Sequence, residues 1–119
     1  RDVTLLGMRL STLTEAARET FKVDEASEGV LVLEVAADSS AAKRGLQPGD
    51  LIVEVQQNLV STPADVAKQI GKIRESNKAR KTKKVKTVLL LVERARNKRF
   101  VAVQLDDGAK QKSGDKAKE

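Results

Sequence analysis

Histidine, cysteine, tyrosine and tryptophan are all absent from this chain of 119 residues, and phenylalanine occurs only twice. Without histidine and cysteine the chain cannot form a Ser-His-Asp or Cys-His nucleophile pair, an imidazole or thiolate zinc site, or a disulfide. We therefore expect no catalytic residue, no metal site and no cofactor. Two aromatic rings are also too few to stack the bases of single strands, so the composition does not favour nucleic acid as a partner.

The basic charge is concentrated in one segment of the chain. The formal net charge is +6, and residues 72–86 hold eight basic residues against one acidic residue, a local net charge of +7. The simplest interpretation is a solvated connector between two structural elements. The alternative is a weak, salt-dependent contact of Lys78–Lys86 with a polyanion or a membrane surface.

The length of the chain fits one domain with a single modest core. The sequence begins at Arg1 without a recognisable signal sequence, which predicts that it is part of a larger protein. We expect a folded domain over residues 1–105. Residues 106–119 contain no aliphatic side chain larger than alanine and are predicted to be a disordered, charged tail.

The stretch "GVLVLEVAADSSAAKRGLQPGDLIVEV" has the clearest local pattern. Residues 30–35 predict a buried strand, Asp38, Ser39 or Ser40 can cap a short helix, and Gly45 ends that helix. Pro48 and Gly49 then predict a tight turn, in which the Asp50 carboxylate accepts backbone N–H bonds. A second strand over residues 51–55 completes the unit.

Further elements follow on both sides of this unit. Thr62, Pro63 and Asp65 form a variant capping box, and Val66, Ile70 and Ile73 recur at helical spacing, which predicts an amphipathic helix. That helix is expected to end around Ser76. Residues 3–14 predict a short strand and a glycine turn followed by a short helix, and "TVLLLVER" and "RFVAVQL" predict a hairpin linked by residues 95–98.

These elements together predict an α+β fold, a small, partly open β-barrel or sandwich. It contains about five strands, one long helix and one or two short helices.

The spacing of Ala42, Gly45-Leu46, Gly49-Asp50 and Ile52 resembles the pattern of PDZ domains. The element Leu6-Gly7-Met8 opens the chain and "RFVAVQL" closes it, an order that is similar to the circularly permuted PDZ domains of bacterial HtrA or Do-type serine proteases. The likeness is greatest to the C-terminal, second PDZ domain of DegP-like members. The segment from Ser76 to Thr87 departs from the family by its length and basic character.

The expected binding site lies between the strand after Gly7 and the long helix. A free strand edge at residues 8–10 could accept an extended peptide, and the amides around Gly7 could form a nest for a terminal carboxylate, which the resemblance implies is the carboxylate-binding loop. Val66 and Ile70 could equally face the core, and Gly7 could be an ordinary turn glycine. The predicted peptide-binding residues are Leu6, Gly7, Met8, Arg9, Leu10, Val66, Ala67 and Ile70.

The resemblance implies a non-catalytic, peptide-binding module of a periplasmic protease and chaperone. Its ligands would be C-termini or extended segments of unfolded proteins, bound by β-strand addition. The alternative is an element of oligomer assembly that docks on the first PDZ domain and the protease domains of its parent and of neighbouring subunits.

Overall fold

Seven strands and three helices make up the computed structural model, which describes residues 2–105. The predicted tail, residues 106–119, lies outside the described residues. The strands are β1 (Val3–Leu5), β2 (Met8–Thr12), β3 (Val30–Val35), β4 (Leu51–Val55), β5 (Asn58–Leu59), β6 (Thr87–Arg94) and β7 (Asn97–Gln104), and the helices are α1 (Glu15–Phe21), α2 (Ser40–Lys43) and α3 (Pro63–Lys78).

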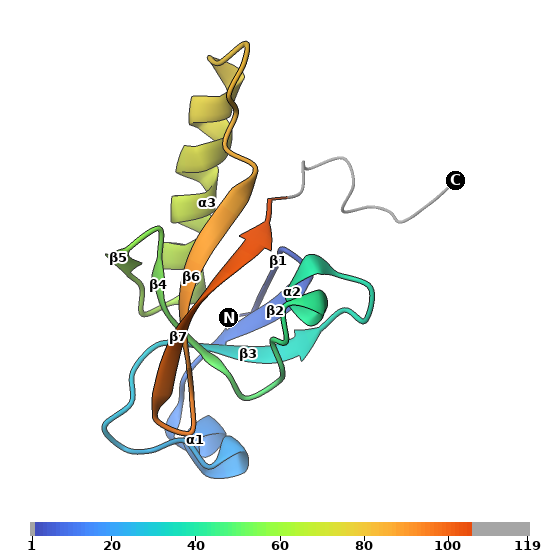
Figure 1. The fold of residues 1–119 in the computed structure, drawn as a ribbon. Coiled ribbons are helices and arrows are strands. Elements are labelled where there is room, and N and C mark those ends of the chain that lie inside the picture. Colours follow the sequence, from blue (N-terminus) through green and yellow to red (C-terminus); the bar gives the residue numbers. More distant parts are fainter. Residues whose placement is uncertain (1, 106–119) are drawn as a thin grey trace.

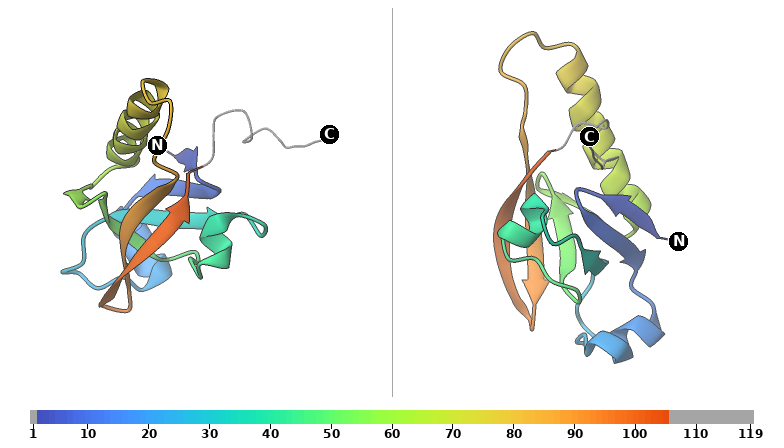
Figure 2. Two further views of the ribbon diagram at one scale, coloured as in Figure 1. Left: turned by 45° about the horizontal axis from the view of Figure 1, so that its top comes forward. Right: turned by 90° about the vertical axis from the view of Figure 1, so that its right-hand side faces the viewer.

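All strands belong to one antiparallel sheet with the order β1-β2-β3-β4-β6-β7, and β5 pairs with β4 beside this path. The sheet is open and strongly twisted, so that the long β6–β7 hairpin crosses in front of β2 and β3 (Figure 1, Figure 2). Register shifts between Arg9 and Leu10 and between Ile52 and Glu54 add to this curvature. The α+β fold and the open architecture agree with the prediction.

The structure has two strands more than the five expected, because residues 3–12 form two strands instead of one and Asn58–Leu59 add the short β5. Leu6 and Gly7, with φ of 56° and 79°, make a two-residue turn between β1 and β2. The C-terminal hairpin also turns more tightly than expected: Ala95 and Arg96 alone link β6 to β7. Turns of this kind match the right-handed twist of their strands.

Helix α3 begins as its sequence predicts and packs one face against the sheet. The Thr62 hydroxyl accepts a bond from the Asp65 amide at 3.1 Å, and the Asp65 carboxylate accepts bonds from the amides of Ser61 and Thr62, which lower the pKa of Asp65. The helix runs to Lys78, one half-turn beyond the predicted end at Ser76. Among the described residues, no helix combines the length and apolar character needed to cross a membrane.

The turn after α2 is built around a buried carboxylate. Gly45 and Gly49 have φ of 90° and 98°, and the Asp50 carboxylate accepts the Gln47 amide at 2.9 Å, which confirms the predicted turn acceptor. Asp50 also forms an ion pair with Arg94 through contacts of 2.7 and 2.8 Å, an interaction that raises the pKa of Arg94. Asp50 therefore joins the turn to strand β6, in addition to capping it locally.

Candidate functional site

Strand β2 and the adjacent loop carry five of the predicted site residues, and the first half of α3 carries the other three. The helix contacts both β1 and β2, so these two groups of residues lie on neighbouring elements. In the right-hand view of Figure 2, β1 and β2 run beside the lower part of α3. We call the site formed by residues 6–10 and by Val66, Ala67 and Ile70 the β2–α3 slot.

The predicted free edge of β2 does not exist in this structure. Strand β2 pairs with β3 on one side and with β1 on the other, in the register Val3↔Leu10, Thr4↔Arg9 and Leu5↔Met8. Residues that flank a two-residue hairpin turn exchange backbone hydrogen bonds, and such pairs alternate along the strands. The backbone groups of Met8 and Leu10 therefore face Leu5 and Val3. The margin expected to receive a peptide is occupied by the chain's own β1.

The predicted apolar wall is core rather than open surface. The side chains of Met8, Leu10, Val66 and Ile70 are between 0% and 1% exposed, and Leu6 is 3% exposed. Ala67 is half-buried. In β1, Leu5 is partly buried against the same core, whereas Thr4 is exposed. The interpretation of Val66 and Ile70 as core-facing residues, which the sequence left open, therefore describes their side chains in this state.

The Arg9 side chain points away from the slot into solvent. Its guanidinium group lies 2.8 Å from the Asp2 carboxylate and 3.3 Å from that of Glu34. The hydrogen bond between Arg9 and Asp2 lowers the pKa of the Asp2 carboxyl and raises that of the Arg9 guanidinium. Arg9 thus ties the segment before β1 to β2, and its backbone groups, which lie in the non-hydrogen-bonded position opposite Thr4, point toward β3 and not toward the slot.

Gly7 is required at its position by backbone geometry and by a close neighbour. A Cβ at residue 7 would lie 2.5 Å from the Ser39 side chain at the start of α2, and φ of 79° is unfavourable for other residues. The Gly7 carbonyl also accepts a bond of 2.8 Å from the Ala36 amide. The loop is therefore fixed against α2, and its Met8 amide faces Leu5 in the hairpin.

A separate cavity of about 540 Å³ opens near α1, at the other end of the sheet. Phe21, Leu51 and the buried Glu93 line it, and none of the predicted site residues does. Glu93 accepts a hydrogen bond from the Ser27 hydroxyl. Within residues 2–105 no three His, Cys, Asp or Glu side chains gather closely enough to hold a metal ion.

Comparison with known families and proteins places this geometry in context. A family model described as PDZ domain matches residues 4–105. A DegP-like periplasmic serine endoprotease of Brucella suis biovar 1 is 37% identical over 82 residues, which are 69% of this chain and 15% of that protein. A protein of the same description from Chlamydia muridarum is 30% identical over 102 residues, 86% of this chain and 18% of its own length. The chain thus spans less than a fifth of these relatives.

Two solved structures are similar over most of the chain. The HtrA-type protease AlgW with a decapeptide aligns with a TM-score of 0.60 and 25% identity, covering 87% of this chain and 28% of AlgW. The PDZ domain of HtrA3 bound to a phage-derived ligand aligns with a TM-score of 0.59 over 87% of this chain and 86% of that domain. Its identity is 23%, which supports the fold alone.

Proposed function

Since the chain belongs to the PDZ domain family, we propose that it is a non-catalytic module that binds C-termini or extended segments of other proteins by β-strand addition. The residues proposed to receive the ligand are the backbone groups of β2 and the loop before it, with Val66, Ala67 and Ile70 of α3 forming the opposite wall. One observation carries this proposal: the β2–α3 slot already holds one extended strand, β1, in antiparallel register.

In this proposal the ligand takes the place of β1. Strand β1 has three residues, of which Val3 and Leu5 are half-buried and Thr4 is exposed. A ligand strand would remake the backbone hydrogen bonds that β1 gives up, so the exchange of one strand for another is nearly balanced in hydrogen bonds. Net affinity then comes from longer pairing along β2 and from side chains placed against α3. It is reduced by the fraction of molecules in which β1 stays docked.

A disulfide lock tests this exchange directly, because the chain has no cysteine of its own. Thr4 and Arg9 are exposed partners in the non-hydrogen-bonded position of the hairpin, where α-carbons lie about 4.5 Å apart, within the range of a disulfide. In the variant Thr4→Cys/Arg9→Cys, oxidation should abolish binding of an apolar-ended peptide, and reduction should restore it. The Thr4→Ser/Arg9→Ser variant is the matched control and should bind the peptide equally under oxidising and reducing conditions.

The lock also separates two ways in which the proposal can fail. Equal binding by the oxidised and reduced forms would show that the ligand does not use the place of β1. Absence of binding in both forms, and in the chain without substitutions, would reject peptide binding itself. A peptide of micromolar affinity, about −8 kcal/mol, is sufficient for the titration.

The preference for chain ends needs its own test. Successive amides near Gly7 are the groups proposed to receive a terminal carboxylate. A peptide with a free C-terminus should then bind more tightly than its amidated form. Equal affinities would restrict the slot to internal extended segments, of the kind that β1 itself provides.

The setting of the module follows from its relatives and is proposed on that basis. The similar proteins of Brucella and Chlamydia are named periplasmic serine endoproteases. We therefore place this domain in a DegP-like protease and chaperone of the periplasm, most like its C-terminal, second PDZ domain. Its ligands there would be exposed ends and segments of unfolded proteins.

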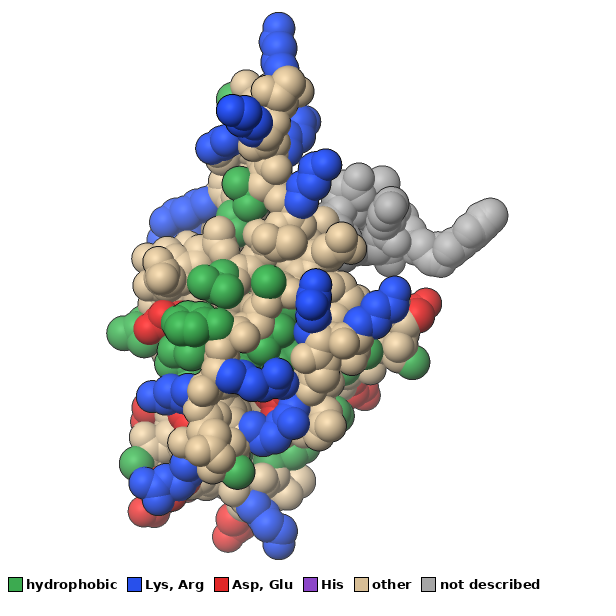
Figure 3. Space-filling model, in the orientation of Figure 1, with side chains coloured by type: hydrophobic (Ala, Val, Ile, Leu, Met, Phe, Trp, Pro, Cys, Tyr) green, Lys and Arg blue, Asp and Glu red, His purple; other side chains and the backbone are tan. Residues whose placement is uncertain are grey.

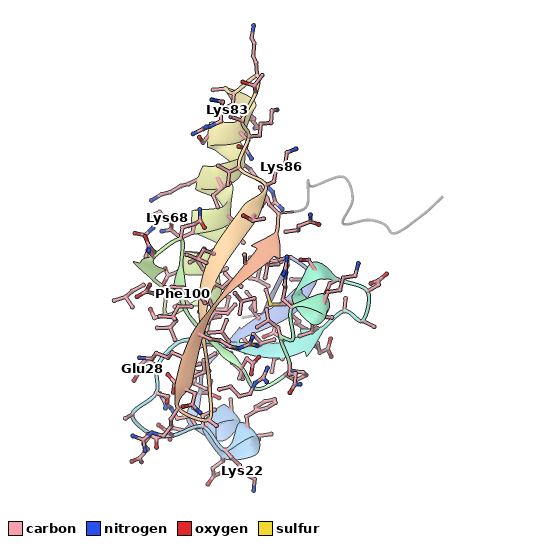
Figure 4. The ribbon with its side chains drawn as sticks, viewed as in Figure 1. Lys22, Glu28, Lys68, Lys83, Lys86 and Phe100 are labelled. Atoms are coloured by element: carbon pink, nitrogen blue, oxygen red, sulfur yellow. The ribbon has the colours of Figure 1, made fainter. Side chains whose placement is uncertain are left out.

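A second function, in oligomer assembly, is favoured by one apolar surface. Leu59 and Phe100 are 78% and 57% exposed. The pairings Glu54↔Leu59, Glu54↔Leu91 and Leu91↔Phe100 place them in one row across the outer face of the sheet. Figure 3 shows hydrophobic side chains gathered over these strands. Figure 4, in the same orientation, labels Phe100 in this region.

An assembly role would make this face dock on a first PDZ domain or on a protease domain of a neighbouring subunit. Sedimentation of the chain with a first PDZ domain should then show a complex, and Phe100→Ser should weaken it. The Thr4→Cys/Arg9→Cys lock should leave that complex unchanged. The absence of a complex both with a first PDZ domain and with a protease domain at high micromolar concentration would remove the assembly role.

A further inference from the structure

Residues 76–86 form a projection that we call the basic finger. It comprises the last half-turn of α3 and the connection to β6, and it extends away from the sheet in all ribbon views (Figure 1, Figure 2). It lengthens the molecule, whose principal extents are 44 × 30 × 24 Å. The finger contains six basic residues and no acidic residue.

The finger is held closed by side-chain bonds to its own backbone. The Asn77 side chain donates to the Val85 carbonyl at 2.9 Å and accepts from the Val85 amide at 2.8 Å, so the two ends of the loop are clamped. The Arg80 guanidinium donates to the Lys83 carbonyl at 3.2 Å, and Lys83 has φ of 59°. These hydrogen bonds hold the basic residues of the finger close together, although the repulsion between their like charges favours a more open loop.

The lysines of the finger are available for contact. All six basic side chains are exposed, and Figure 4 labels Lys83 near the upper end of α3 and Lys86 at the base of the finger. Lys78 pairs with Glu75 at 3.5 Å, just below the finger, and Arg80 is engaged with the backbone. Lys81, Lys83, Lys84 and Lys86 form no ion pair with any acidic residue in the described part of the chain.

We propose that the basic finger binds the anionic surface of a phospholipid bilayer. A convex tip with cations on its sides presents its charges to a flat, extended anionic surface more completely than to a pocket-sized ligand. Lysine ammonium groups are strongly hydrated point charges, suited to headgroups and not to bidentate base recognition. The finger has no aromatic residue for base stacking, and its one large apolar residue, Val85, packs against the core. The contact is therefore superficial, electrostatic and reversible.

Vesicle binding with a charge-matched control tests the proposal. Vesicles of phosphatidylcholine with about one-third phosphatidylglycerol should bind the chain, and pure phosphatidylcholine vesicles should not. Each lysine near such a surface is worth about fivefold in partitioning, so Lys81→Gln/Lys83→Gln/Lys84→Gln should weaken binding about 30- to 100-fold. The control Lys22→Gln/Lys43→Gln/Lys98→Gln removes three exposed lysines outside the finger and has the same net charge as the finger variant. It should weaken binding severalfold at most.

Equal losses in the two triple variants would overturn the proposal, because binding would then follow net charge and not the finger. Tighter binding of duplex DNA than of anionic vesicles at equal salt would overturn it in favour of nucleic acid. Raising NaCl from 0.1 to 1 M shortens the screening length from about 10 to 3 Å and should release the chain from the vesicles.

Asn77 is expected to act as a positioning residue. Asn77→Ala opens the clamp without removing a charge and should weaken vesicle binding severalfold while leaving the unfolding midpoint nearly unchanged. Binding identical to that of the parent chain would show that the closed shape of the finger does not matter and would overturn that part of the proposal.

Discussion

The β2–α3 slot and the basic finger lie at opposite ends of the same helix, and they differ in every property that governs binding. The slot is apolar, buried and filled by β1, whereas the finger is charged and exposed, and its four lysines from Lys81 to Lys86 form no ion pair with a described acidic group. A ligand in the slot must replace part of the fold, so its affinity is linked to the stability of β1. A surface that meets the finger replaces only water and counterions, so its affinity is linked to salt.

The largest expected difference between the two regions is in stability. Ile70 is fully buried on the α3 wall of the slot, so Ile70→Ala should lower the free energy of unfolding by about 2 to 5 kcal/mol. Lys81→Gln in the finger should change it by less than about 0.5 kcal/mol. Urea denaturation of both variants measures this contrast. A cost below 1 kcal/mol for Ile70→Ala would mean that the wall is not part of the core.

A smaller loss is expected at the turn that leads β1 into the slot. Gly7→Ala meets both an unfavourable φ and Ser39 at 2.5 Å, and we expect a loss of about 2 to 3 kcal/mol. Gly45→Ala is the matched control, because its φ of 90° is equally unfavourable but its nearest neighbour is a flexible arginine end at 3.6 Å. It should cost about 1 to 2 kcal/mol. Thermal unfolding can rank the two, and equal costs would argue against tight packing of the loop on α2.

The smallest expected effect is a pH dependence of β1 docking. The Asp2 pKa is lowered by Arg9, so this ion pair favours docked β1 above the ordinary aspartate pKa of about 3.9 and is lost as pH falls through the lowered value. An amidated peptide without titratable groups should therefore bind slightly more tightly as pH falls through that range. Asp2→Asn should remove this difference while leaving the titration of other groups in place. If the unsubstituted chain and Asp2→Asn show the same pH dependence of peptide binding, that dependence arises from a group other than Asp2.

Local sequence signals predicted the parts of the fold that depend on neighbouring residues. The capping box at Thr62, the helix after Ser39 and the turn acceptor Asp50 all have the predicted hydrogen bonds. The concentration of charge between α3 and β6 was also evident, because it is a property of composition. These features were predictable because each is formed by residues within four positions of one another.

Pairings between distant or very short segments were not predictable in the same way. The ion pair of Asp50 with Arg94 spans 44 positions. Strand β1 has three residues, too few for a periodic pattern, and the same sequence is compatible with an unpaired segment before β2. The proximity of β2 and α3 was therefore expected, but the occupation of the slot by β1 was not, since that depends on where β1 packs. The alternation of Val3, Thr4 and Leu5 around the Leu6-Gly7 turn was the one available signal.

Amide chemical-shift mapping of the isotope-labelled chain with an apolar-ended peptide tests the exchange of β1 for ligand most directly. We predict large shifts for Met8, Leu10 and residues 66–70, movement of the Val3–Leu5 signals toward unstructured positions, and no change in residues 78–86. Shifts in β2 and α3 while the Val3–Leu5 signals keep their strand positions, or shifts confined to β7, would contradict the account.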